Sequence, residues 1–156
     1  MTKNFYYSIL PSTVSANGTG PGLQGSGSSI STLSSSGFIL ALETEDGGGN
    51  PTCQIYSYHT NAWNQLGNDI TGAVSSLSLS SNGTTAAIGF GTIDTVRIND
   101  FDGTLWNQLR SDIGGEAAYD YFGSSASLSS DGTMLAIGAY LNDGNEVVGR
   151  SGHVQV

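Results

Sequence analysis

Side chains that could perform nucleophilic, acid–base or metal chemistry are few in this sequence and lie far apart. The two histidines are His59 and His153, and neither has a cysteine or a second histidine at the spacing of a metal site. The single cysteine, Cys53, lies in the strand-like stretch TCQIY and cannot form a disulfide within the chain. No serine lies in the strand–GxSxG–helix pattern of a nucleophile elbow. The sequence therefore predicts a protein that is not an enzyme and that needs no cofactor.

The loop NDGNE at residues 142–146 could offer oxygen ligands to a metal ion. Asp143, Asn145 and Glu146 are its candidates, because calcium prefers carboxylate and amide oxygens. The alternative is an exposed polar loop without a metal, and this is the one that we expect. The stretch GTGPG at residues 18–22 lacks the helix and the lysine of a phosphate-binding loop, so it indicates a flexible linker.

The charge of the chain excludes several classes of partner. Lysine and arginine together number four against 13 acidic residues, which gives a net charge of −9. Nucleic-acid binding needs basic side chains that displace counterions from phosphate, and anionic membranes also attract basic segments. No apolar run approaches the roughly 20 residues that span a bilayer, and the first residues lack the apolar core of a classical secretion signal. We expect neither a nucleic-acid partner nor membrane insertion.

One octapeptide occurs twice, and this repetition predicts the fold. WNQLGNDI at residues 63–70 and WNQLRSDI at residues 106–113 agree at six of eight positions. Three turn sequences, SSSG, SSNG and SSDG, end in Gly37, Gly83 and Gly132, which lie 46 and 49 residues apart. A period of about 40–50 residues is typical of β-propeller blades.

Each repeat unit predicts four antiparallel strands. An alternating segment such as SLSLSS leads into an Asn-Gly or Asp-Gly turn, for which we expect a type I′ hairpin. A continuous apolar run such as TAAIGF then indicates a strand that is buried on both faces. Two more strands follow, and the last contains the tryptophan. We predict an all-β chain with almost no helix, forming a β-propeller-like array of three four-stranded antiparallel blades. The single domain spans residues 1–156, with blades at about 30–70, 71–113 and 114–156.

The repeated aromatic and apolar residues are expected to pack between blades. Large aromatic side chains contribute strongly to such contacts because they bury much area with few rotatable bonds. We assign this packing role to Trp63, Leu66, Trp106, Leu109 and Phe122. The alternative is that a tryptophan contributes to a ligand site.

The ends of the sequence predict how the last blade is completed. The third unit stops at Val156, which aligns with Ile55 and Ile98 in the middle of the third strand. We expect the β-rich segment NFYYSIL at residues 4–10 to complete this blade, with a Gly/Ser-rich loop over residues 11–29. Propellers typically have four to eight blades. Two copies with three blades each could close one larger ring, which predicts a homo-oligomer.

The third unit contains several short motifs in a fixed order. They are Phe122-Gly123, the strand Ser125–Leu128, the run Ala136-Ile137-Gly138-Ala139, and Gly152 before HVQV. This pattern resembles FG-GAP-type and related propeller repeats, most clearly over residues 120–156. Integrin-like members of that family carry a calcium loop with spaced aspartates. The turns SSSG, SSNG and SSDG have at most one carboxylate each, so the departure argues against calcium in these turns.

Composition and repeats together favour a non-enzymatic structural or adhesive module. A rigid, acidic chain rich in Gly, Ser and Thr suits an exposed extracellular surface. The scarcity of lysine and the lack of a secretion signal favour a virion component, such as a capsid decoration, knob or fibre protein. We expect it on a virion surface or outside the cell, bound to further copies of itself or to a capsid protein. An extracellular adhesion module is an alternative.

A second alternative is a lectin-like propeller that binds a glycan between blades. The candidates are aromatic, amide and carboxylate side chains near the hairpins: Tyr56, Tyr58, Trp63, Asn99, Asp100 and Trp106. Equivalent positions differ between the units, because Asn99 replaces Tyr56 and Phe101 replaces Tyr58. This difference favours the structural interpretation.

Overall fold

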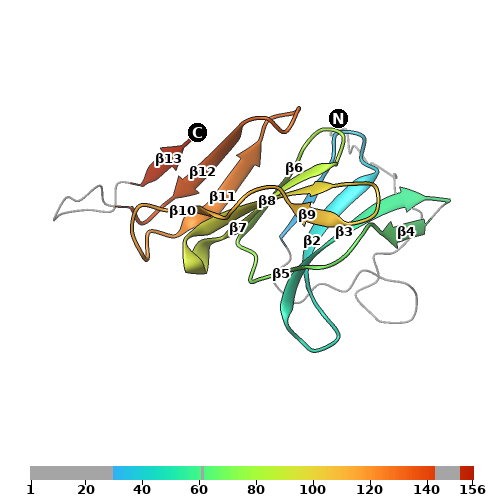
Figure 1. Cartoon of the computed structure of the whole chain (residues 1–156), viewed down its shortest axis with the longest axis horizontal. Coiled ribbons are helices and arrows are strands. Elements are labelled where there is room, and N and C mark those ends of the chain that lie inside the picture. Colours follow the sequence, from blue (N-terminus) through green and yellow to red (C-terminus); the bar gives the residue numbers. More distant parts are fainter. Residues whose placement is uncertain (1–29, 61, 143–151) are drawn as a thin grey trace, which may run out of the picture.

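The computed structural model of the chain describes residues 30–60, 62–142 and 152–156. In these ranges the chain forms three antiparallel β-sheets that follow one another in sequence order (Figure 1). The helical content of the described ranges is one short 3₁₀ element, η1 (Gly91–Ile93). The prediction of an all-β chain built as three sheets is confirmed.

The same strand order recurs in successive sheets. The first sheet contains β1 (Ser31–Leu33), β2 (Ile39–Glu45), β3 (Pro51–His59), β4 (Ala62–Gln65) and β5 (Ile70–Thr71). The second sheet contains β6 (Ser76–Leu79), β7 (Thr85–Phe90), β8 (Thr95–Phe101), β9 (Trp106–Gln108) and β10 (Ile113–Gly114). The third sheet contains β11 (Phe122–Leu128), β12 (Leu135–Ala139) and β13 (His153–Gln155).

The predicted fourth strand is split in two in the first and second sheets. Both β4 and β5 pair with β3, and both β9 and β10 pair with β8. Each of these sheets therefore has four strand positions with a broken outer edge. The third sheet has three described strands, and the residues that we expect to complete it, 4–10, lie outside the described ranges together with the predicted loop at 11–29.

The hairpin turn that opens each unit differs from the prediction. A type I′ turn needs a positive φ at both central residues, but in each turn only the glycine has one. These glycines have φ values of +73°, +72° and +73° at Gly37, Gly83 and Gly132. Asn82 acts through its side chain, since its Oδ1 accepts a hydrogen bond from the Thr84 amide at 3.1 Å. The type I′ prediction is wrong because this side-chain contact stabilises a turn with a single left-handed glycine.

The three turns are joined by a ladder of hydrogen bonds. The Ser35 amide donates to the Ser81 carbonyl at 3.2 Å, and the Ser81 amide donates to the Ser130 carbonyl at 2.8 Å. The hydroxyls of Ser35 and Ser81 are also 2.7 Å apart. A Cβ at Gly83 would lie 2.6 Å from Cγ1 of Ile39. The turns of the second and third sheets therefore each rest on the sheet before them, and the sheets stack in a fixed register.

Two faces of each sheet must be distinguished, because side chains alternate along a strand. We call the face toward the preceding sheet the leading face and the face toward the following sheet the trailing face. On β7, Ala86, Ile88 and Phe90 lie on the leading face, in the core shared with the first sheet. Val96 on β8 lies on the trailing face, in a second core with Phe122 of the third sheet. Apolar cores thus lie between consecutive sheets, as blade packing requires.

Candidate functional site

The aromatic candidates of the first sheet lie together on its leading face. Tyr58 on β3 is in register with Trp63 on β4, and their ring centroids are 5.2 Å apart at an interplanar angle of 55°. Phe38, just before β2, stacks on Tyr58 at 6.4 Å and 12°. Tyr56 shares this face because it lies two residues before Tyr58 on the same strand. Tyr58 and Trp63 are half-buried and Phe38 is 52% exposed, so the row of rings is open to solvent.

Amide and carboxylate groups flank these rings. The Tyr56 hydroxyl donates to Gln54 Oε1 at 2.6 Å, and Gln54 Nε2 donates to Asp69 Oδ1 at 3.0 Å. Gln65 Nε2 donates to the same Asp69 oxygen at 2.6 Å. Burial raises the pKa of Tyr56, and the negative charge of Asp69 raises it further. The phenol therefore stays protonated at neutral pH, and the surface combines ring faces with fixed polar groups.

The candidates of the second sheet lie elsewhere. Trp106 is 3% exposed and Asn99 is 4% exposed, because both lie on the leading face that packs against the first sheet. Asp100 belongs to the opposite, trailing face by strand alternation. The six predicted ligand residues therefore do not converge on one pocket. Those that share an accessible face are the three of the first sheet, Tyr56, Tyr58 and Trp63.

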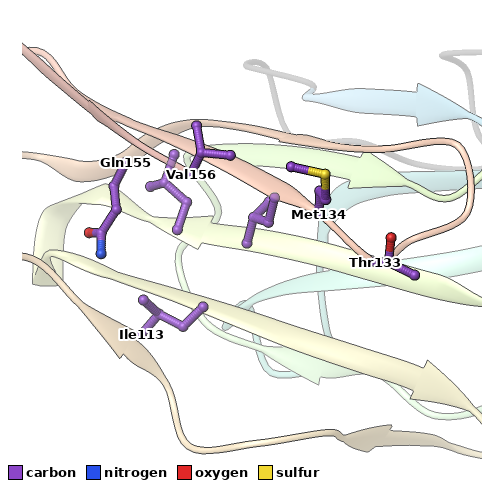
Figure 2. A pocket seen from close by; sticks show the side chains of 7 residues that line it. Ile113, Thr133, Met134, Gln155 and Val156 are labelled. Carbon is purple, nitrogen blue, oxygen red and sulfur yellow. The ribbon is translucent and has the colours of Figure 1, made fainter.

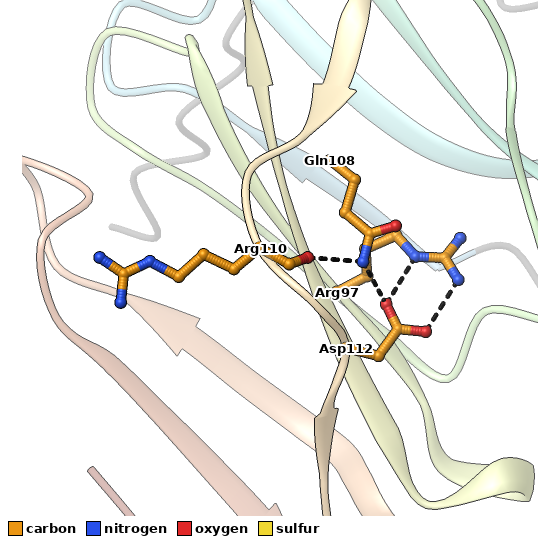
Figure 3. A network of polar contacts seen from close by, with 4 residues as sticks. All are labelled: Arg97, Gln108, Arg110 and Asp112. Carbon is orange, nitrogen blue, oxygen red and sulfur yellow. Dashed lines mark hydrogen bonds and ion pairs between the residues drawn. The ribbon is translucent and has the colours of Figure 1, made fainter.

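In the second sheet, the ion pair of Arg97 and Asp112 occupies the position that the hydrogen bond between Gln54 and Asp69 has in the first sheet (Figure 3). Arg97 Nε and Nη2 donate to the two carboxylate oxygens of Asp112 at 2.8 and 2.9 Å. Gln108 Nε2 donates to Asp112 Oδ1 at 2.8 Å and to the Arg110 carbonyl at 2.6 Å. The hydrogen bond from Arg97 lowers the pKa of Asp112, and the same contact raises the pKa of Arg97. Both oxygens of the carboxylate are engaged, so this group fixes the outer edge of the second sheet.

Trp106 is held by the loop that follows β4, residues 66–68. Its indole Nε1 donates to the Leu66 carbonyl at 2.7 Å, and its backbone amide donates to Asn68 Oδ1 at 2.8 Å. A Cβ at Gly67 would lie 2.9 Å from Trp106 Cδ1, and Gly67 has a φ of +78°. Glycine meets both conditions without strain. We call residues 66–68 the tryptophan socket.

The socket explains why the two octapeptides are unequal. Their only differences place Arg110 and Ser111 where the first sheet has Gly67 and Asn68. These are the residues that receive Trp106 from the following sheet. The second sheet therefore repeats the strand and the tryptophan but not the socket.

The predicted packing residues have different environments. Phe122 is 3% exposed in the core between the second and third sheets, and Leu66 packs at the edge of the first core. Trp63 is half-buried on the leading face of the first sheet. Leu109 is 52% exposed. A packing role for Leu109 is wrong in the described part of the chain, because it follows β9 where the socket is not repeated.

Residues 30–60, 62–142 and 152–156 contain no group of three or more His, Cys, Asp or Glu side chains that could hold a metal ion. The candidates Asp143, Asn145 and Glu146 lie outside these ranges. Burial, with a smaller effect of Asp69, raises the pKa of the Cys53 thiol to about 12. Cys53 is therefore a buried apolar residue at neutral pH.

A pocket of about 370 Å³ opens beside β13 (Figure 2). It is lined mainly by apolar side chains from β10, β12 and the end of the chain. They are Ile113, Thr133, Met134, Leu135, Ile137, Gln155 and Val156. Among the described strands, β13 pairs with β12 and leaves its other edge without a partner.

Two features escaped the sequence reasoning. The first is the socket, whose signal was present as the two unequal positions of the octapeptide. The second is Asp94, whose carboxylate accepts hydrogen bonds from the amides of Tyr119 and Phe122 at 2.7 and 3.1 Å. It holds a loop in which Tyr119 and Tyr121 have φ values of +71° and +57°. No local sequence pattern indicates this contact, because Tyr119 and Phe122 follow Asp94 by 25 and 28 residues in the chain.

Comparison with known proteins supports the interpretation of the third sheet. Residues 114–156 match the FG-GAP repeat, which confirms the resemblance based on Phe122-Gly123. No curated protein sequence matches the chain. Among solved structures, hydrazine synthase of Kuenenia stuttgartiensis is similar at a TM-score of 0.51 and 15% identity. The match covers 80% of this chain and 44% of that chain, so it shows a shared fold and the chain spans less than half of that structure. No helix in the described ranges is long and apolar enough to cross a membrane.

Proposed function

We propose that this chain is a non-enzymatic structural or adhesive module of the β-propeller type, located on a virion surface. The observation that carries this proposal is the repeated packing of sheet on sheet, which uses the conspicuous aromatic residues of the second sheet for cohesion. Trp106 and Phe90, for instance, are buried between the first and second sheets. The strongly acidic surface, with a net charge of −9, agrees with an exposed location.

The fold proposed for this module is a set of three blades that become part of a larger ring. We propose that residues 4–10, which lie outside the described ranges, pair with the edge of β13 that has no partner among the described strands and complete the third blade. The apolar pocket beside that edge supports this, since an outer strand could place an aromatic side chain there, as β9 places Trp106 in the second sheet. A ring of four to eight blades, as in typical propellers, needs blades besides these three, and further copies of this chain are the source that we propose.

Two measurements test this proposal. Quantitative mass spectrometry of purified virus particles should find the chain in many copies, and its absence from every particle fraction would remove the virion assignment. Deletion of residues 4–10 should lower the melting temperature of the full chain. A control deletion of seven residues within 11–29 should leave it nearly unchanged, and equal effects of the two deletions would contradict the closing-strand role.

A lectin-like function is the second candidate, and one observation favours it. Phe38, Tyr58 and Trp63 form an accessible row of rings flanked by Gln65 and Asp69. A glycan array probed with the full chain tests this function directly. Binding that is lost in Trp63→Ala but kept in Leu105→Ala, an exposed apolar control, would replace the structural proposal. Binding to no glycan would remove this candidate.

A further inference from the structure

We propose that the trailing face of the third sheet binds the leading face of the first sheet of a second copy, so that copies stack head to tail. This inference rests on the proposed structural function and assigns the surface that carries it. Positions that are buried between sheets inside the chain recur as exposed positions on the two outer faces of the stack.

The trailing face of the third sheet exposes apolar side chains beside β12 and β13, and the exposed serines Ser125 and Ser127 lie on the same face along β11. Register along β3, β8 and β13 makes Cys53, Val96 and Val154 equivalent, because they pair with Glu43, Gly89 and Gly138 at one repeat position. Cys53 and Val96 are each 0% exposed under the following sheet, whereas Val154 is 66% exposed. Met134 is equivalent to Ile39 and Thr85, and it is 61% exposed. On the first sheet this surface is covered by the second sheet, and on the second sheet by the third. On the third sheet the equivalent surface is exposed.

The leading face of the first sheet has the matching property at its turn end. Leu33 is equivalent to Leu79 of the second sheet, and their exposed fractions are 56% and 9%. A Cβ at Gly37 would meet nothing within 4 Å, whereas one at Gly83 would meet Ile39. The inner positions of this face are already covered, since Leu42 is 7% exposed. The free part of the face is therefore its turn end, with Leu33 and Phe38 as apolar anchors.

The serine ladder defines how the two faces would meet. Within the chain, Ser35 donates to Ser81 and Ser81 donates to Ser130. The next rung joins the Ser130 amide to the Ser35 carbonyl of the second copy. This rung places Gly37 of that copy over Met134, as Gly83 lies over Ile39. The contact is heterologous, because it joins two different surfaces, and it closes into a ring or continues as a filament according to the rotation per copy.

Cysteine pairs test this geometry. The double variant Ser35→Cys/Ser130→Cys should form disulfide-linked oligomers on mild oxidation. It should form no bond within one chain, because the Ser81 turn lies between the two positions. Each single variant should stay uncrosslinked, since a head-to-tail contact never brings two identical positions together. Ser35→Cys/Ser81→Cys is the positive control, because the parent hydroxyls are 2.7 Å apart and should give a bond inside one chain. Cys53 is buried and does not interfere.

A charge variant gives an independent readout. Met134→Lys should weaken self-association by roughly tenfold or more, because the apolar side chain that would lie beneath Gly37 of the second copy becomes charged. Leu109→Lys is the matched control, since Leu109 is similarly exposed but lies on neither end face. Both are compared with the unmodified chain by sedimentation equilibrium.

The outcomes separate this inference from the proposed function. The head-to-tail contact is supported if Ser35→Cys/Ser130→Cys forms crosslinked oligomers, the single variants do not, and Met134→Lys has a lower oligomer mass than the unmodified chain. An oligomer that keeps its mass in Met134→Lys and gives no crosslink overturns the contact but leaves a structural module that assembles through another surface. Equal crosslinking of the single variants indicates a symmetric contact and overturns the inference, as does a single-chain mass at every concentration. Copy number in virus particles still decides the proposed function in each case.

Discussion

Replacement of the two tryptophans by alanine should have very different effects, although both occupy the first position of the same octapeptide. Trp106 is 3% exposed and donates its indole N–H to the Leu66 carbonyl. Large-to-small changes at buried tryptophans cost about 3–5 kcal/mol. Trp106→Ala also leaves the Leu66 carbonyl without its donor, which accounts for about 1 kcal/mol of such a loss. Trp63 is half-buried and keeps its main contact with Tyr58, so Trp63→Ala should cost roughly half as much, about 1.5–2.5 kcal/mol.

Urea unfolding and thermal unfolding, both followed by circular dichroism, measure this difference, because the signal does not depend on the fluorophore that each variant removes. For a domain of this size, a loss of 1 kcal/mol lowers the melting temperature by about 2–4 °C. Trp106→Ala should therefore lower it by roughly 6–20 °C, well beyond the effect of Trp63→Ala. The protein is kept dilute so that self-association does not stabilise either variant. A loss for Trp63→Ala that equals or exceeds the loss for Trp106→Ala would refute the assignment of residues 66–68 as the socket.

Three further outcomes follow from the same contacts. Gly67→Ala should destabilise the fold by about 2–4 kcal/mol, because Gly67 has a positive φ and lies against Trp106. Gly37→Ala should cost only about 1–2 kcal/mol, because Gly37 has a similar φ but open space around it. Equal losses of the two variants in urea titrations would contradict the contact between Gly67 and Trp106. The side-chain hydrogen bond from Ser129 and contacts from Thr133 lower the pKa of Asp131 to about 2, from an ordinary 3.8. Because this pKa is lower in the folded chain than in the unfolded chain, the ionised Asp131 stabilises the fold above about pH 4, and this stabilisation is lost as the pH falls toward 2. An NMR titration should therefore place the Asp131 midpoint near 2. A midpoint near 3.8 would show that the turn contacts are absent in solution. The Cys53 thiol, with its pKa raised to about 12, should resist a thiol reagent at pH 8 in the folded chain and react fully in denaturant; rapid labelling without denaturant would contradict its burial.

The repeat made the sheets predictable, because its period, its turn residues and its apolar runs all describe one local unit. The strand expected over TAAIGF, for example, is β7, which occupies Thr85–Phe90. The turn type was mispredicted, because Asn82 contributes a side-chain acceptor and keeps a negative φ. An asparagine before a glycine can adopt a positive φ or accept a hydrogen bond through its side chain, and sequence spacing does not distinguish the two.

The candidate site was less predictable than the fold, because it depends on which sheet covers which face. Tyr58 and Phe101 are equivalent in sequence, yet the neighbouring Trp63 stays half-buried while Trp106 is buried. This difference in burial arises because Trp106 packs against the first sheet, whereas no described sheet precedes the first sheet and covers Trp63. No pattern inside a single unit contains that information, although the change from Gly67 to Arg110 marks the place where the two units differ.

The tryptophan socket and the Trp106 side chain that fills it come from different repeat units, and this fixes the order of the units along the chain. The socket belongs to one unit and the indole that fills it belongs to the next, so the units cannot be permuted freely. If residues 71–113 were moved ahead of residues 30–70, Arg110 would stand where Trp63 needs a glycine, and the Leu66 carbonyl would lose the donor that Trp106 provides. An engineer who lengthens this chain would therefore have to transplant half of one unit with half of the next, taking the socket and its tryptophan as one cassette.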